Sequence, residues 1–245
     1  MSLVILVAVL LLGAGGLASW ASDSHGPAPT PDPPTPTPAY RSYLPLVAHV
    51  MEAEPVTLTL TVPPTAWQAE SAGLDYATVV AGTAWLVTYD QSVPAVGQSA
   101  TAGDRMYRSN KAFLFFDTSA IPAHATVLSA TLTAANCWKV AGVPFTVEFY
   151  RTAASFPPAP TDWLNYGGPL VGTLPSELCG VWSAPVSATV TLDPDSVVKG
   201  GLTAYALTTD RLRQALAPAW GAADKLIFDC YADDTLVVRY VIPPQ

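Results

Sequence analysis

Charged residues are scarce in this chain of 245 residues: only 12% are Asp, Glu, Lys or Arg, whereas half are hydrophobic. The 11 Lys and Arg are scattered and are outnumbered by 19 Asp and Glu, so the net charge is 11 − 19 = −8. A chain without a basic cluster cannot neutralise a run of phosphates, which argues against a nucleic-acid partner. The same deficit argues against docking on an anionic membrane surface.

Histidine is almost absent, and with it the usual catalytic base. The histidines are His25, His49 and His124. Only His124 falls inside the expected domain, in a turn, where a solvated residue is the plainer interpretation. Nucleophilic catalysis by a Ser–His or Cys–His pair needs a positioned imidazole. The motifs G-x-S-x-G, H-E-x-x-H and Gly-x4-Gly-Lys are also missing.

A glycosidase would need two facing carboxylates at a defined separation. The candidate glutamates of the domain are Glu70, Glu148 and Glu177. Several aspartates, such as Asp117 and Asp193, are explained as turn residues. We therefore expect no enzymatic activity, and an unrecognised polysaccharide-active hydrolase remains the alternative.

Cysteine is limited to Cys137, Cys179 and Cys230, with no CxxC pair and no spacing that would suit zinc. Cys230 shares strand parity with Leu226 and Phe228, which predicts a buried thiol. If export oxidises one pair, Cys137 and Cys179 are the candidates. We expect no cofactor other than a structural calcium ion, for which the candidate ligands are Asp229, Asp233 and Asp234. The alternative is that these are plain turn aspartates.

The first fifth of the chain does not have the composition of a folded domain. Leu3–Ala18 is an almost unbroken apolar run, and Ser19 and Ala21 are small residues suited to signal-peptidase cleavage. Gly26–Pro38 holds seven prolines in thirteen residues (GPAPTPDPPTPTP), which favours extended polyproline II. We therefore expect a signal peptide at 1–21, or an uncleaved N-terminal anchor, a Pro/Thr-rich linker at 22–50 and a domain at 51–245.

Alternating apolar and polar residues recur along that domain, which is typical of half-buried strands. Lys111–Phe116 (KAFLFF) is apolar on both faces and predicts a central strand. Only Thr209–Ala217 suggests a helix. The other expected strands are Val56–Val62, Ala84–Tyr89, Thr126–Asn136, Pro144–Thr152, Val186–Leu192, Leu202–Leu207, Lys225–Tyr231 and Thr235–Val241. The pattern predicts an all-β fold of two packed antiparallel sheets, a jelly-roll β-sandwich.

The stretch KAFLFFDTSAIPAHATVLSATLT (111–133) resembles the signature of secreted jelly-roll modules called DNRLRE domains. The matching residues are Lys111, Phe116, Asp117, Ser119, Ile121, Pro122, Ala130 and Leu132. The closing ADDTLVVRYV is also similar, and the resemblance covers about 74–241. Lys111 stands where the family usually has Arg, and the family's Trp-rich segment is only loosely matched around Trp163. The resemblance implies a jelly roll, with surface display and, in some relatives, polysaccharide binding.

Aromatic side chains are the best candidates for a ligand site. Sugar rings stack on exposed indole or phenol faces flanked by polar groups. The candidates are Trp138, Trp163, Tyr166, Trp182 and Tyr231, which lie in or beside expected loops or on a half-exposed strand. The alternative is that each belongs to the core. We thus expect a secreted, cell-surface module that binds polysaccharide, the alternative being a structural surface or virion-type domain that contacts other proteins. The oligomeric state is not predicted.

Overall fold

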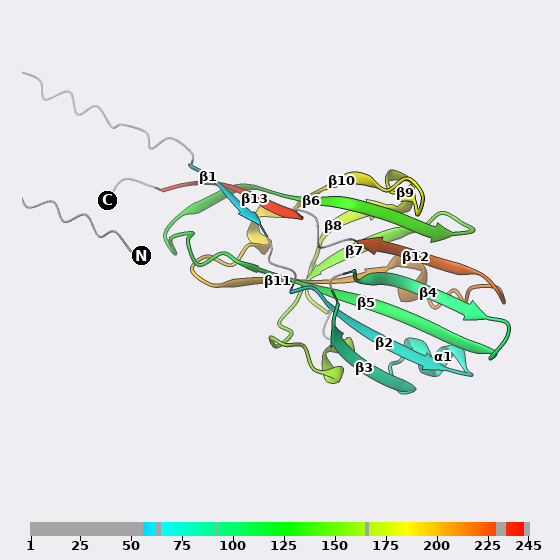
Figure 1. The fold of residues 1–245 in the computed structure, drawn as a ribbon. Helices are drawn as coiled ribbons and strands as arrows, with labels where there is room; N and C mark the ends of the chain where they lie inside the picture. Colours follow the sequence, from blue (N-terminus) through cyan, green and yellow to red (C-terminus); the bar gives the residue numbers. More distant parts are fainter. Residues whose placement is uncertain (1–55, 62–64, 92, 165–166, 229–233, 243–245) are drawn as a thin grey trace, which may run out of the picture. The chain divides into compact units, whose positions relative to one another are not determined.

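The computed structural model describes residues 56–242 except 62–64, 92, 165–166 and 229–233 (Figure 1). The expected signal peptide, the linker, the domain boundary and Cys230 lie outside the described residues. Within them the chain is all-β, as expected, with short helices between the strands. No helix among the described residues is long and apolar enough to cross a membrane.

In the described part of the chain, thirteen strands form one curled sheet, antiparallel except at the two-residue strand β9. The strands are β1 (Val56–Thr61), β2 (Trp67–Gly73), β3 (Trp85–Asp90), β4 (Ala95–Thr101), β5 (Met106–Asp117), β6 (Thr126–Ala141), β7 (Thr146–Arg151), β8 (Leu170–Pro175), β9 (Gly180–Val181), β10 (Val186–Leu192), β11 (Leu202–Thr209), β12 (Ala223–Phe228) and β13 (Thr235–Val241). The helices are α1 (Tyr76–Val80), α2 (Asp210–Arg213) and the 3-10 helices η1 (Pro160–Leu164), η2 (Ser176–Leu178) and η3 (Pro194–Ser196).

The predicted helix at 209–217 is confirmed only in its first half. Thr209 caps α2, because its side chain accepts a hydrogen bond from the Leu212 amide. The helix ends at Arg213, and Ala215 then adopts a left-handed backbone conformation. The expectation of a single helix was wrong, because Asp75 caps the short α1 in the same way, through the Thr78 amide. Strands β2, β4, β8 and β9 were not expected. The sequences of β2 and β4 are rich in Gly, Ala or polar residues, and β9 has only two residues.

Strand β5 is central, as predicted, because it is shared between two parts of the sheet. Along one edge it pairs with β2, and along the other it pairs first with β4 and then with β11. The sheet therefore divides at β5 into two arms. The first arm continues through β4 and β12 to β6, which also pairs with β13, β10 and β9, and the second arm continues through β11 and β7 to β8.

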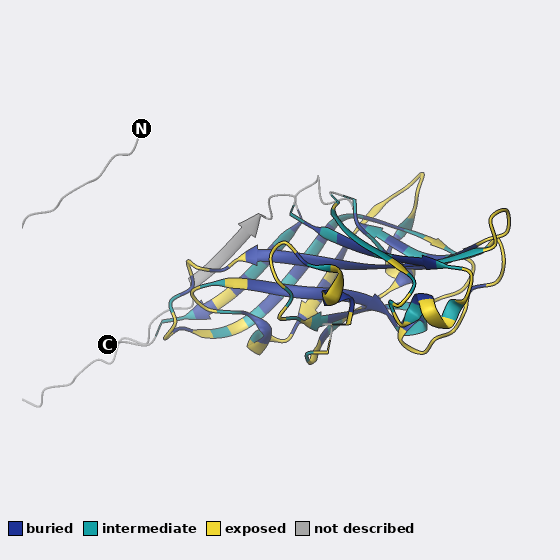
Figure 2. Cartoon of the chain, turned by 90° about the horizontal axis from the view of Figure 1, so that it is seen from below, coloured by how far each residue is buried: buried dark blue, intermediate teal, exposed yellow. Residues whose placement is uncertain are grey.

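The main core lies between the two arms, and Figure 2 shows buried residues along the strands and exposed ones at the loops. Alternate residues of β5, Ala112, Leu114 and Phe116, enter this core. It is completed by side chains from both arms, including Leu132, Val147, Phe149, Leu207, Leu226 and Phe228. The intervening residues Phe113 and Phe115 form a second cluster outside the second arm. This is why KAFLFF is apolar on both faces.

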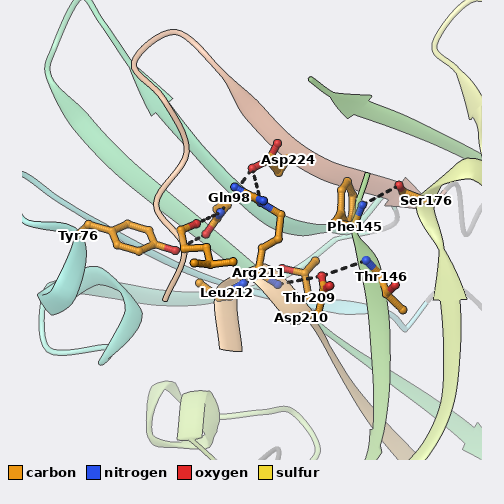
Figure 3. A network of polar contacts seen from close by, with 11 residues as sticks. Tyr76, Gln98, Phe145, Thr146, Ser176, Thr209, Asp210, Arg211, Leu212 and Asp224 are labelled. Carbon is orange, nitrogen blue, oxygen red and sulfur yellow. Dashed lines mark hydrogen bonds and ion pairs between the residues drawn. The ribbon is translucent and has the colours of Figure 1, made fainter. Parts of the chain in front are cut away.

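A polar seam closes the place where the arms diverge, between β4, β12 and α2 (Figure 3). Asp224 accepts a hydrogen bond from Arg211 Nε at 2.9 Å, and Gln98 donates to the Leu216 carbonyl at 2.6 Å. Tyr76 of α1 donates to Gln98, and burial raises the pKa of Tyr76 to about 12, so the phenol keeps its proton. Gln98 and Asp224 are buried, so these bonds offset the cost of removing them from water.

We predict that Asp224→Ala lowers the free energy of unfolding by about 2–3 kcal/mol, because it leaves Arg211 without its acceptor and removes the 3.5 Å contact of Asp224 with Gln98, which keeps the Leu216 carbonyl. Arg211 is partly exposed and regains some hydration, which limits the loss. Urea unfolding measures the effect. Asp90→Ala, at an exposed aspartate, is the control and should change stability by less than about 0.5 kcal/mol. Equal effects of the two variants would contradict a stabilising seam.

Candidate functional site

The structure separates the five aromatic candidates. Trp182 is 73% exposed, whereas Trp138 and Trp163 are only 5% and 1% exposed. Trp138 and Trp163 therefore pack in the interior, which is the alternative that the sequence left open for each ring. Tyr166 and Tyr231 lie outside the described residues. The position of an aromatic residue along a strand or loop does not show whether its ring is exposed or buried. The exposure of the ring depends on which loop covers it.

Trp163 covers a lysine instead of a ligand. It lies in η1 against Phe113 and Phe115, and its indole donates to the Val80 carbonyl at 3.2 Å. The amine of Lys111, which is 2% exposed, lies 4.4 Å from the Trp163 ring centre and donates to the Trp163 carbonyl at 2.8 Å. Burial lowers the pKa of Lys111 to about 6. The carbonyl and the ring favour the ammonium form, so burial is the larger effect.

Trp182 stands at the tip of a loop that a disulfide holds against β6. Cys137 and Cys179, the pair chosen from the sequence, are joined, with 5.2 Å between their Cα atoms. The next two residues form β9, which pairs with Trp138 and Lys139. The Trp182 ring lies edge-on to Trp138, with 4.9 Å between centroids. The disulfide and β9 thus fix an exposed indole in one position.

A polar cluster lies where β2 pairs with the first half of β5. Glu70 accepts hydrogen bonds from Arg108 at 3.0 Å, Tyr89 at 3.2 Å and Asn110 at 3.3 Å. Burial and the nearby Glu70 carboxylate raise the pKa of Tyr89 to about 12, so Tyr89 remains a donor. The hydrogen bond to Glu70 raises the pKa of Arg108. The cluster is a pre-oriented set of donors and acceptors on the sheet surface.

Lys225 joins this cluster from β12. Burial lowers its pKa, and the charges of Glu70 and Arg108 act on that pKa in opposite directions. The strand register places Lys225 in one row with Asn110 and Glu70. Lys225 pairs with Gly97, Gly97 pairs with Asn110, and Asn110 pairs with Glu70. Directly paired residues lie on the same face of a sheet. Gly97, the residue of β4 between Lys225 and Asn110 in this row, has no side chain.

The same register extends this face to the tryptophans. On β12, Ile227 is two residues from Lys225 and pairs with Trp138 of β6. We call the surface formed by Trp182, Trp138, Lys225, Asn110, Arg108 and Glu70 the outer face. From β6 to β2 it crosses four strand spacings, or about 19 Å. It faces away from the main core, which the opposite face of β12 contacts through Leu226 and Phe228.

Sequence reasoning missed the polar part of the outer face. Arg108 and Asn110 are two residues apart just before the apolar run of β5, so they lie on the same face of that strand. This spacing was the sequence signal that could have indicated a polar face. Glu70 lies in β2, whose Ala- and Ser-rich sequence did not suggest a strand. The sequence could not show that Lys225 lies on the same face as Glu70 and Arg108, because β12 does not pair with β5 directly. The two strands are separated by β4.

Two adjoining cavities of about 590 and 540 Å³ open elsewhere, beside β7, and share Arg151 and Val198. Arg151 donates to the Asp195 carbonyl at 3.4 Å, and Lys199 donates to the Ala125 carbonyl at 2.9 Å. None of the described residues that line them is aromatic.

The carboxylates considered for catalysis and calcium mostly have structural partners. Glu148 accepts from Arg213 at 2.8 and 2.9 Å, on a different arm from Glu70. Asp234 accepts from the Ala135 amide at 2.7 Å, whereas Asp229 and Asp233 lie outside the described residues. Within the described part of the chain, no group of three or more His, Cys, Asp or Glu is arranged to hold a metal ion. His124 is exposed in its turn.

Comparison with known proteins adds no relative. No protein-family model, curated protein or solved structure matches the chain.

We predict that Lys111 makes stability rise with pH. Because its pKa in the folded state is about 6 and its ordinary value is 10.5, the unfolded chain binds more protons between these limits. The free energy of unfolding should therefore fall toward pH 6 and rise by up to about 1.4 kcal/mol per pH unit toward pH 9. Urea unfolding at pH 7 and pH 9 should show a shallower rise in Lys111→Met. Equal slopes would show that Lys111 is charged when folded.

We predict that replacing Cys137 and Cys179 together with Ser lowers the free energy of unfolding by about 3–4 kcal/mol, because 42 residues separate the bridged positions. The loss of the covalent link should also release the loop that carries Trp182. Thermal unfolding and the intrinsic fluorescence of the tryptophans measure the two effects. A variant as stable as the disulfide-bonded protein would refute this role.

Proposed function

We propose that this chain is a secreted, cell-surface binding module that recognises polysaccharide through its outer face. The observation that carries the proposal is the exposed Trp182 indole, held beside Trp138 by a disulfide-bonded loop at one end of a face with fixed polar groups. The resemblance of 111–133 to DNRLRE domains supports the proposal. We further propose that the curled sheet is a jelly-roll sandwich of that type, with its two arms as the two layers.

The physical basis is the amphipathic nature of a pyranose ring. Its C–H face packs on an indole, while its hydroxyl groups need donors and acceptors in fixed positions. Trp182 supplies the indole surface, and the cluster around Glu70 supplies the hydrogen-bond donors and acceptors. Both elements are held before any ligand arrives, so little conformational entropy is lost on binding.

A second candidate function is a structural domain that contacts other proteins. The observation in its favour is the set of exposed apolar residues near Trp182 in sequence or pairing: Val140, Val143, Leu178, Val181 and Val186. A large apolar patch favours a protein partner. The polar groups along the same outer face favour the carbohydrate.

We predict that Trp182→Ala weakens polysaccharide binding by about tenfold or more, since it removes the stacking surface. Glycan arrays and affinity electrophoresis of the purified chain measure binding, with calcium and with a chelator. Trp220→Ala is the matched control, because Trp220 is also exposed but contacts Tyr107, whose position in β5 is on the opposite face. The absence of binding to any polysaccharide, or an equal loss in both variants, would favour the structural function.

A further inference from the structure

Two cations line a hollow in a chain whose net charge is −8. The hollow consists of the two adjoining cavities beside β7, and we call it the cationic hollow. Arg151, the last residue of β7, lines both cavities, and Lys199, in the turn before β11, lines the one of 540 Å³. Asp195 supplies the one carboxylate among the described lining residues. Two positive charges against one negative charge favour an anionic ligand.

Both cations can be reached by a ligand and keep most of their hydrogen-bonding capacity. Arg151 and Lys199 are exposed, and each donates to one backbone carbonyl, that of Asp195 or of Ala125. Neither cation pairs with a carboxylate of the described residues. A guanidinium carries five N–H donors and an ammonium three. Most of these donors therefore remain for a group that enters the hollow.

Backbone contacts hold the walls of the hollow in position before a ligand arrives. The Arg151 amide donates to the Pro169 carbonyl at 3.1 Å. Gly168 lies so close to the same strand that a Cβ atom there would be 1.9 Å from the Arg151 carbonyl oxygen. The amide of Val198, which lines both cavities, donates to the Thr203 hydroxyl at 2.9 Å. A site whose backbone is already ordered loses less entropy on binding.

We infer that the cationic hollow is a second carbohydrate subsite, which binds the carboxylate of a uronic acid within an acidic polysaccharide. Arg151 pairs with the planar carboxylate through parallel N–H···O bonds, a geometry that suits a guanidinium. Lys199 contributes a second positive charge from the same cavity. This inference rests on the proposed function in taking a polysaccharide as the ligand. It adds the chemical class of the sugar and a site that does not include Trp182.

The size and the walls of the hollow favour a short stretch of a sugar chain. Cavities of 590 and 540 Å³ both fall in the range of about 300–1,000 Å³ that is usual for small-molecule sites. Because Arg151 lines both cavities, a linear chain can place a carboxylate at Arg151 and a neighbouring ring in each cavity. The described lining residues include no aromatic ring, so the affinity depends on charge and should fall as salt screens it.

The test measures binding of the full chain to trigalacturonate by isothermal titration calorimetry, with the fully methyl-esterified form as the neutral control ligand. Arg151→Gln and Lys199→Gln should each weaken binding of the acid by about tenfold or more, since each removes a charged hydrogen bond. Thermal unfolding checks that both variants keep the fold. Arg239→Gln and Lys139→Gln are the matched control variants, because they remove the same charge from residues that do not line the hollow. Both should bind trigalacturonate as the unaltered chain does.

The Trp182→Ala variant separates this inference from the proposed function. Trp182 does not line the hollow, so this variant should bind trigalacturonate as the unaltered chain does. Binding of the ester as tight as that of the acid, or undiminished binding by Arg151→Gln, would overturn the subsite and keep any polysaccharide binding that needs Trp182. Inorganic sulfate or triglutamate bound as tightly as trigalacturonate would overturn the sugar as the ligand. Trigalacturonate binding that needs Arg151, with no polysaccharide whose binding needs Trp182, would confirm the subsite and overturn the outer face as the binding surface.

Discussion

The division of the sheet at β5 is the constraint on which the rest of the structure depends. One edge of this strand hydrogen-bonds to β4 and then to β11, so two arms leave it in different directions. Alternate side chains of β5 therefore enter two different apolar clusters. The polar seam of Gln98, Asp224 and Arg211 fills the place where the arms part, where an apolar plug would leave backbone carbonyls such as that of Leu216 unpaired.

The division also decides which surfaces are available for a ligand. The outside of the second arm is covered by η1, so Trp163 and Lys111 are buried there. On the outside of the first arm, the side chain of Arg108 is partly exposed. The rigidity of this arm comes from paired strands and from the Cys137–Cys179 bridge, which places the Trp182 loop against β6. A face supported in this way can hold polar groups in fixed positions for recognition.

The structural features that could be predicted from the sequence were those that depend on residues close together along the chain. Alternation identified β10 and β13 with their observed bounds and identified KAFLFF as a central strand. The strands β2 and β4 were missed because their burial comes from close packing of small and polar residues, not from an apolar stripe. The outer face was missed for a related reason, since Glu70, Asn110 and Lys225 come from three strands far apart in the sequence.

Strand period, turn residues and composition act locally, so they were enough to predict an all-β chain of low charge with a preferred cysteine pair. Which aromatic rings are exposed and which polar residues meet follows from the fold of the whole sheet. Trp163 and Trp182 have the same chemistry, but one is covered by the second apolar cluster and the other projects from a loop. Exposure and proximity depend on which strands pair across long separations, and that choice is made by packing of the whole sheet.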